Sequence, residues 1–81
     1  MVKVIIYNLL RSKYGINEIE VQPGSITKIM DEIVERHPNI IRSDFDTCVV
    51  FVKGQPLHLR KFDTIIEDND EIIFTNFVGG G

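Results

Sequence analysis

The sequence predicts an α+β fold: a mixed sheet of four to five strands with one main helix across one face. A single stretch, residues 26–36, has apolar residues at helical spacing, whereas short apolar or alternating runs typical of strands stand before and after it. The 81 residues give room for one small domain. One helix cannot bury both faces of a sheet, so we expect it to cover one.

The N-terminal part predicts a hairpin. Residues 2–10 are rich in β-branched and aliphatic residues, which predicts a first strand. Residues 11–15 are a polar connection. Over residues 17–22 apolar and polar residues alternate, which predicts a half-buried second strand with Ile19 and Val21 turned inward.

A turn and a cap precede the predicted helix. Pro23-Gly24 is typical of a type II turn, and Ser25 can cap the helix N-terminus. The residues that recur at i, i+3, i+4, i+7 and i+8 form one apolar stripe: Ile26, Ile29, Met30, Ile33 and Val34. We expect the helix to end at His37-Pro38, because a residue before proline is disfavoured in the α region.

The second half of the chain predicts three more strands. Residues 47–53 are a continuous apolar run, typical of a strand that is buried on both faces or central in a sheet. Residues 55–59 predict a short edge strand, since Pro56 is not tolerated in the middle of a sheet. Residues 71–75 predict the last strand.

Two connections complete the predicted order. Residues 39–46 have no clear pattern, and we expect Ile40, Ile41 and Phe45 to pack at the edge of the core. Residues 63–70 are rich in turn-forming residues, and we expect a solvated turn there.

Composition argues against several classes of function. The net charge is −3 and the basic residues are scattered, which disfavours nucleic acid as a partner. No segment reaches the ~20 apolar residues of a membrane span, and the opening apolar run is too short for a signal peptide, so we expect a cytoplasmic protein. His37, His58 and Cys48 have no ligand spacing, which predicts no metal site, and we expect Cys48 to be buried.

The sequence closes on Phe77-Val78-Gly79-Gly80-Gly81, directly after the last predicted strand. Glycine lacks Cβ, so such a run forms a thin stalk that can enter a channel too narrow for other residues. We therefore expect a single domain over residues 1–78 and a flexible tail over residues 79–81, with the α-carboxylate as a candidate reactive group. The alternative interpretation is a frayed end.

Both ends of the chain resemble a known family. The opening VKVIIYNLLRSKYGINEIEV and the closing DNDEIIFTNFVGGG are similar to the small subunit of molybdopterin synthase, a MoaD-like protein of the MoaD/ThiS sulfur-carrier superfamily. The resemblance covers the whole chain, most weakly residues 39–46, and implies the β-grasp, or ubiquitin-like, fold. Two features depart from the family: Thr75-Asn76-Phe77 replaces two frequent prolines, and three glycines stand where the family has two.

The resemblance implies a carrier and not an enzyme. A partner similar to ubiquitin-activating enzymes would use ATP and magnesium to adenylate Gly81, and a sulfur donor would then convert the adenylate to a thiocarboxylate. The large subunit of molybdopterin synthase would accept the sulfur. Gly79 and Gly80 would form the stalk, and the carrier would hold no permanent cofactor and no catalytic residue.

The resemblance also implies residues that bind these partners. We expect Phe77 and Val78 to lie against an apolar groove of the partner. Phe74 and Tyr7 are further candidates, although an aromatic residue in a strand is more often core. Two alternatives stay open: a ubiquitin-like protein modifier that uses the same tail, and a sulfur carrier for thiamine or another pathway. A plain interaction module with an incidental tail is the third interpretation.

Overall fold

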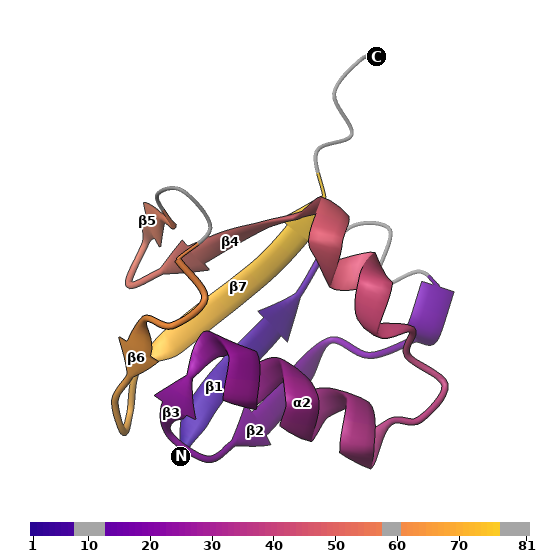
Figure 1. Cartoon of the computed structure of the whole chain (residues 1–81), viewed down its shortest axis with the longest axis horizontal. Coiled ribbons are helices and arrows are strands. Elements are labelled where there is room, and N and C mark those ends of the chain that lie inside the picture. Colours follow the sequence, from indigo (N-terminus) through magenta and orange to yellow (C-terminus); the bar gives the residue numbers. More distant parts are fainter. Residues whose placement is uncertain (8–12, 58–60, 77–81) are drawn as a thin grey trace.

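The computed structural model describes residues 1–7, 13–57 and 61–76. Its elements in chain order are β1 (Val2–Ile6), β2 (Glu18–Val21), β3 (Gly24–Ser25), α2 (Ile26–Arg36), the 3-10 helix η1 (Arg42–Thr47), β4 (Cys48–Val52), β5 (Gln55–Pro56), β6 (Ile65–Ile66) and β7 (Glu71–Asn76). Five strands form a mixed sheet in the order β2-β1-β7-β4-β5, and β3 pairs with β6 in a second, small sheet (Figure 1). The predicted α+β architecture is confirmed.

The last strand lies at the centre of the main sheet. β1 pairs antiparallel with β2, which confirms the predicted hairpin, and parallel with β7. On its other side β7 pairs antiparallel with β4, and β4 pairs antiparallel with β5. Strand β7 is therefore held on both sides along its length, and it delivers the chain to one end of the sheet.

Helix α2 crosses one face of this sheet (Figure 1). As the sequence predicts, the Ser25 side chain caps it: the Lys28 backbone N–H donates to Ser25 Oγ at 3.2 Å. The helix ends at His37, whose backbone N–H donates to the Ile33 carbonyl at 2.9 Å. Its apolar stripe is buried against the sheet at Ile26, Ile29, Met30 and Ile33.

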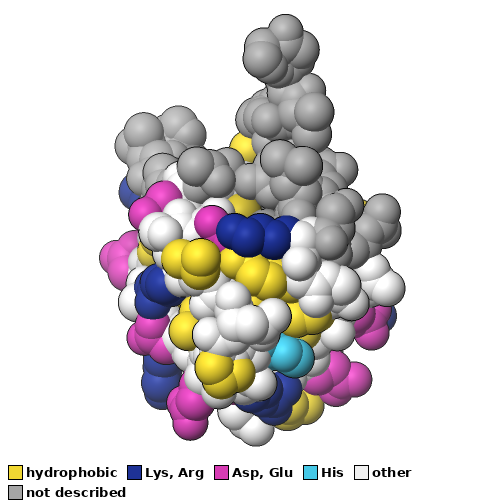
Figure 2. Space-filling view, turned by 90° about the vertical axis from the view of Figure 1, so that its right-hand side faces the viewer, with side chains coloured by type: hydrophobic (Ala, Val, Ile, Leu, Met, Phe, Trp, Pro, Cys, Tyr) yellow, Lys and Arg dark blue, Asp and Glu magenta, His cyan; other side chains and the backbone are white. Residues whose placement is uncertain are grey.

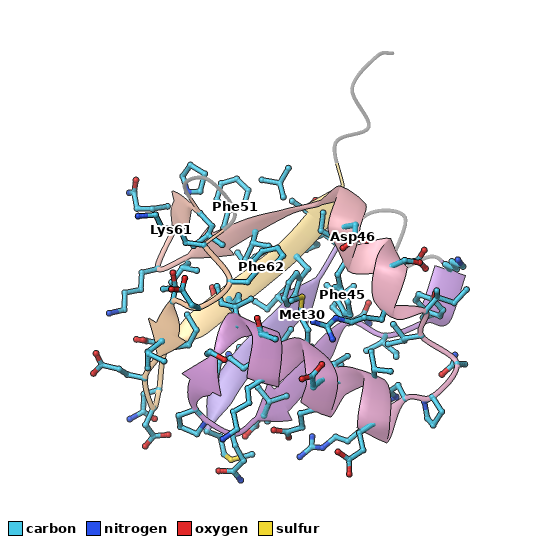
Figure 3. The ribbon with its side chains drawn as sticks, viewed as in Figure 1. Met30, Phe45, Asp46, Phe51, Lys61 and Phe62 are labelled. Carbon is cyan, nitrogen blue, oxygen red and sulfur yellow. The ribbon has the colours of Figure 1, made fainter. Side chains whose placement is uncertain are left out.

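The core lies between α2 and the sheet. Met30 of α2 and Phe45 of η1 point into this layer (Figure 3). The ring of Phe45 lies 5.0 Å from that of Phe74 in β7, centroid to centroid, in a tilted arrangement. The strands contribute the inward-facing residues of each alternation: Val2, Val4, Ile6, Ile19, Val21, Cys48, Val50, Ile66, Ile72 and Phe74.

The small sheet corrects the prediction of a type II turn at Pro23-Gly24. Gly24 has a φ of +153°, which is far from the value such a turn requires at its third position, and it pairs with Ile66 instead. The partner strand β6 lies inside the stretch 63–70 that the sequence predicts as a turn. Two-residue strands of this kind depend on a partner distant in sequence, so they leave no local pattern.

Three further predictions are corrected. The first strand ends at Ile6, earlier than residue 10. Residues 42–47 form η1, and Ile41 just before it is 53% exposed instead of packed at the core edge, although Ile40 and Phe45 are buried as predicted. Hydrophobic side chains do reach the surface on the side that carries the α2–η1 connection (Figure 2).

Candidate functional site

The candidate site begins where β7 ends. The three glycines, Phe77 and Val78 lie outside the described residues, so the structure reports on the ground from which they follow. The final residue of β7, Asn76, is the register partner of Cys48, the first residue of β4. The predicted tail therefore follows a strand whose last position is fixed by pairing within the sheet.

The sheet face opposite α2, here called the outer face, is partly apolar. Along the three central strands, buried residues alternate with partly exposed ones. The partly exposed or exposed positions at this face are Ile5, Tyr7, Val49, Phe51, Ile73 and Thr75. None of them is among the hydrophobic side chains that pack against the buried cluster under α2. These apolar residues are therefore available to another molecule.

The register brings these residues into two adjacent rows. Ile5 is paired with Ile73, and Ile73 is paired with Phe51 across the other side of β7. Thr75 is paired with Val49. Tyr7 follows the Ile6–Phe74 pair, and its backbone N–H donates to the Phe74 carbonyl at 3.0 Å. We call Ile5, Tyr7, Val49, Phe51 and Ile73 the apolar patch.

The outer face is divided along the direction of β7. At the start of β7, Lys3 is paired with Glu20 on one side and with Glu71 on the other, so this row is charged. The apolar patch occupies the rows toward the end of β7, from which residue 77 follows. The apolar half of the face and the predicted tail thus belong to the same end of the sheet.

Phe74 does not belong to this surface. The sequence predicts it as a partner-binding residue, but it is 0% exposed and packs against Phe45 in the core. The reason is parity: Phe74 follows Ile73 by one position, so its side chain projects from the opposite side of the strand. Tyr7 is 42% exposed, and its role in partner binding stays a prediction.

Sequence reasoning missed most of the apolar patch. The run at residues 47–53 predicts a strand buried on both faces, whereas Val49 and Phe51 are only partly buried. In a continuous apolar run no polar residue marks the exposed side, so the pattern hides the alternation. One signal was present: Ile73, Thr75 and Phe77 share the same parity in the sequence.

The titratable groups with shifted pKa values lie away from the apolar patch. Asp44 accepts hydrogen bonds from the Tyr14 hydroxyl and from Lys13 Nζ, the latter at 2.9 Å, and these bonds lower its pKa. The bond to Asp44, followed by that to Tyr14, raises the pKa of Lys13. The Tyr14 oxygen also accepts from the Ile41 backbone N–H at 3.1 Å. This cluster ties the segment before β2 to the start of η1.

The described residues offer little for catalysis or ligand binding. Cys48 is 4% exposed, as predicted, and its thiol donates to the Asp44 carbonyl at 3.4 Å. Within residues 1–7, 13–57 and 61–76, no three His, Cys, Asp or Glu side chains come together as metal ligands. No helix in the same part of the chain is long and apolar enough to cross a membrane.

These features define a class of protein: a small sheet with one covering helix, an apolar outer face and a glycine-rich end. The ThiS family model matches residues 4–81, so the chain belongs to the ThiS family. Proteins of this family are non-catalytic sulfur carriers, and the prediction of a carrier that is not an enzyme is confirmed. No curated protein matches the chain at a significant level.

Solved structures support the fold. The chain is similar to the Amycolatopsis orientalis BexX/CysO complex with a TM-score of 0.76 at 19% identity, covering 100% of both chains. It is similar to Urm1 of Sulfolobus solfataricus, with a TM-score of 0.67 at 21% identity over 91% of this chain and 97% of that one. A complex of subunits 1 and 2 of molybdopterin-converting factor from Helicobacter pylori gives 0.67 at 13% identity, over 99% and 97%. The predicted β-grasp fold is confirmed.

Proposed function

We propose that this ThiS-family chain carries sulfur as a thiocarboxylate on Gly81 and donates it in molybdopterin biosynthesis. The observation that carries the proposal is the reach of the family match, which runs to residue 81 and so includes all three glycines. The pathway is supported by the Helicobacter pylori neighbour, which is a complex of the two subunits of molybdopterin-converting factor. We expect the chemistry to take place in the cytoplasm.

The carboxylate must be activated before it can accept sulfur. An α-carboxylate has a pKa of about 3.3–3.7, so it is an anion at neutral pH and a poor electrophile. In the proposed reaction, a carboxylate oxygen of Gly81 attacks the α-phosphorus of ATP on a separate adenylating enzyme, and pyrophosphate leaves with its magnesium. The mixed anhydride that results is electrophilic at the acyl carbon.

Sulfur then replaces the nucleotide. A persulfide of a sulfur donor attacks the acyl carbon, and AMP leaves. A thiol cleaves the acyl disulfide, which leaves a thiocarboxylate on Gly81 and a disulfide on the donor. The second partner, the large subunit of the synthase, would take the sulfur from the thiocarboxylate, and water would restore the carboxylate. The chain supplies a substrate group throughout and no catalytic side chain.

The apolar patch is the proposed surface for both partners. Its exposed apolar side chains lose contact with water when a complementary surface covers them, which favours association. Ile73 and Phe51 lie in the middle of the patch, and Tyr7 lies toward the end of β7. A partner bound here would lie next to residues 77–81, and Phe77 and Val78 would extend the contact toward the partner's active site.

The number of glycines sets how far the carboxylate reaches. Each extra residue of an extended chain adds roughly 3.3–3.6 Å. A partner built for two glycines would therefore meet the carboxylate of Gly81 about one residue too far into its site. We propose that the partners of this chain accept three glycines, and that Gly81, and not Gly80, is the mature end.

A second candidate function rests on other neighbours. The chain is similar to the small archaeal modifier protein 1 of Methanosarcina acetivorans, with a TM-score of 0.75 at 20% identity over 99% of this chain. A modifier would use the same adenylate, but the acyl group would pass to a lysine amine of another protein. A sulfur carrier for thiamine or a different pathway is a third possibility with the same first step.

Intact mass spectrometry of the protein from its own host tests the proposal. Under mild, non-reducing conditions we expect a species heavier than the unmodified chain by the mass difference between sulfur and oxygen. Deletion of Gly81 should remove that species. Mixing the loaded carrier with the purified large subunit and the pterin precursor should form the dithiolene while the extra mass disappears.

Each alternative result has a clear meaning. Conjugates of higher mass on other proteins, without a thiocarboxylate species, would replace the carrier with the modifier. Sulfur loading followed by transfer to a thiazole precursor instead of the pterin would replace the pathway. An unmodified mass in the presence of the host's adenylating enzyme, ATP and a sulfur donor would contradict sulfur loading altogether.

A further inference from the structure

Strand β2 is an edge strand of the main sheet, with β1 on one side only. The Ile6 backbone N–H donates to the Asn17 carbonyl at 2.9 Å, which fixes the alternation: residues of the Asn17 parity turn their backbone groups toward β1. Glu18, Glu20 and Gln22 therefore turn theirs outward. Such a row of outward N–H and C=O groups is a template on which another chain can add a strand.

Two side chains of α2 occupy part of this row. The Gln22 backbone N–H donates to Glu32 Oε1 at 3.1 Å, and Arg36 Nη1 donates to the Glu20 carbonyl. Both contacts come from the helix that lies alongside β2 (Figure 1). One acceptor and one donor of the edge are thus bound to side chains instead of being available to an incoming strand.

The two side chains also hold each other. Arg36 Nη2 lies 3.1 Å from Glu32 Oε2, one helical turn apart on α2. The two side chains are 45% and 24% exposed, so an isolated ion pair between them would contribute little to stability. Because each also binds the backbone of β2, the pair acts as a bracket across the edge.

We propose that the Glu32–Arg36 pair closes the β2 edge against strand addition and so keeps the chain from pairing with a second copy of itself. An incoming strand must form bonds to the Glu20 carbonyl and the Gln22 N–H, and it can do so only by displacing both side chains. The opposite edge has a different protection: β5 has two residues, Gln55 and Pro56, and proline offers no N–H. With both edges closed, the outer face is the surface left for docking.

Charge provides a second barrier at β2. In an antiparallel pair of β2 strands centred on Glu20, the two Glu20 side chains would be opposite each other, and like charges directly opposite are destabilising. The test must therefore remove both barriers. The triple variant Glu20→Thr, Glu32→Ala, Arg36→Ala does so, and threonine and alanine suit a strand and a helix, so the fold should be kept.

A matched control is available on the same helix. Lys28→Ala and Glu35→Ala, combined with Glu20→Thr, make the same change of net charge and add the same two alanines, but Glu35 and Lys28 are exposed and make no printed contact with β2. Sedimentation velocity over a concentration series, together with amide hydrogen exchange, is measured on both triple variants of the full chain. Circular dichroism checks that both are folded.

We expect the triple variant at positions 20, 32 and 36 to dimerise at least about tenfold more tightly than the control, since two backbone hydrogen bonds become available. The amides of Glu18 and Glu20 should become protected in its dimer. Equal sedimentation of the two variants at every concentration would overturn the proposal. A dimer whose new protection falls on the outer face instead of β2 would overturn it as well.

Discussion

The two faces of the main sheet are made by the same strands and by similar residue types, yet they do different work. On the inner face, Ile72 and Phe74 of β7 are fully buried under α2 and η1. On the outer face, Ile73 of the same strand is only partly buried, and it lies between Ile5 and Phe51. The inner residues hold the fold together, whereas the outer ones are apolar without a covering layer. Adjacent positions in one strand can therefore serve stability and binding separately.

The largest effect should come from the inner face. Phe74→Ala removes a fully buried ring that packs against Phe45, and it leaves a cavity in the core. We expect a loss of about 3–5 kcal/mol in the free energy of unfolding. Urea denaturation followed by circular dichroism measures it. A loss below about 1 kcal/mol would mean that the core does not depend on this ring.

The matching change on the outer face should affect binding instead. Ile73→Thr keeps a β-branched residue in the strand, so the free energy of unfolding should change by about 1 kcal/mol or less. If the apolar patch docks the partners, affinity for the adenylating enzyme should fall by about tenfold or more. Isothermal titration calorimetry measures it. Lys3→Gln, at the charged end of the same face, is the control, and equal losses in both variants would contradict the division of the face.

A smaller effect is expected at the anchor of η1, the element that covers the inner face beside α2. Tyr14→Phe removes the hydroxyl that donates to Asp44 and accepts from the Ile41 N–H. We expect a loss of about 1–2 kcal/mol in the free energy of unfolding, because the two partners turn to water. Thermal melting compares the variant with the parent. An unchanged melting temperature would show that η1 needs no such anchor.

The smallest effect concerns pH. The folded-state pKa of Asp44 lies below its ordinary value of 3.8, chiefly because of the hydrogen bond from Tyr14. A lowered folded pKa gives stability that is fully present above the unfolded pKa and is lost as pH falls through the folded pKa. The melting temperature of the parent should therefore fall more steeply below about pH 4 than that of Asp44→Asn. Parallel curves would contradict a stabilising role for this carboxylate.

Several parts of the fold were predictable because their causes are local. Helix α2 shows its period in the sequence, and Ser25 and His37 mark its ends. The alternation around Ile19 and Val21 correctly gave the inward side of β2, since polar residues mark the outward side. The match of the chain's ends to a sulfur-carrier family likewise agrees with the ThiS family model.

The missed elements depend on contacts between distant residues. Gly24 and Ile66 are 42 positions apart, and only their pairing makes β3 and β6 strands. Phe74 and Ile73 stand in one apolar run, so the sequence gives no reason to assign one to the core and the other to the surface. The bracket of Glu32 and Arg36 on β2 requires the helix to lie beside that edge, which no pattern in the helix itself reveals.

The sequence by itself determined the number and type of the main elements, the single helix and the ThiS-family character of the chain, because periodicity, caps and end motifs are properties of neighbouring residues. The tertiary structure alone decided which apolar residues form the core and which form the outer face. Strand register and the position of α2 set that choice, since a side chain is buried only when another element covers its side of the sheet.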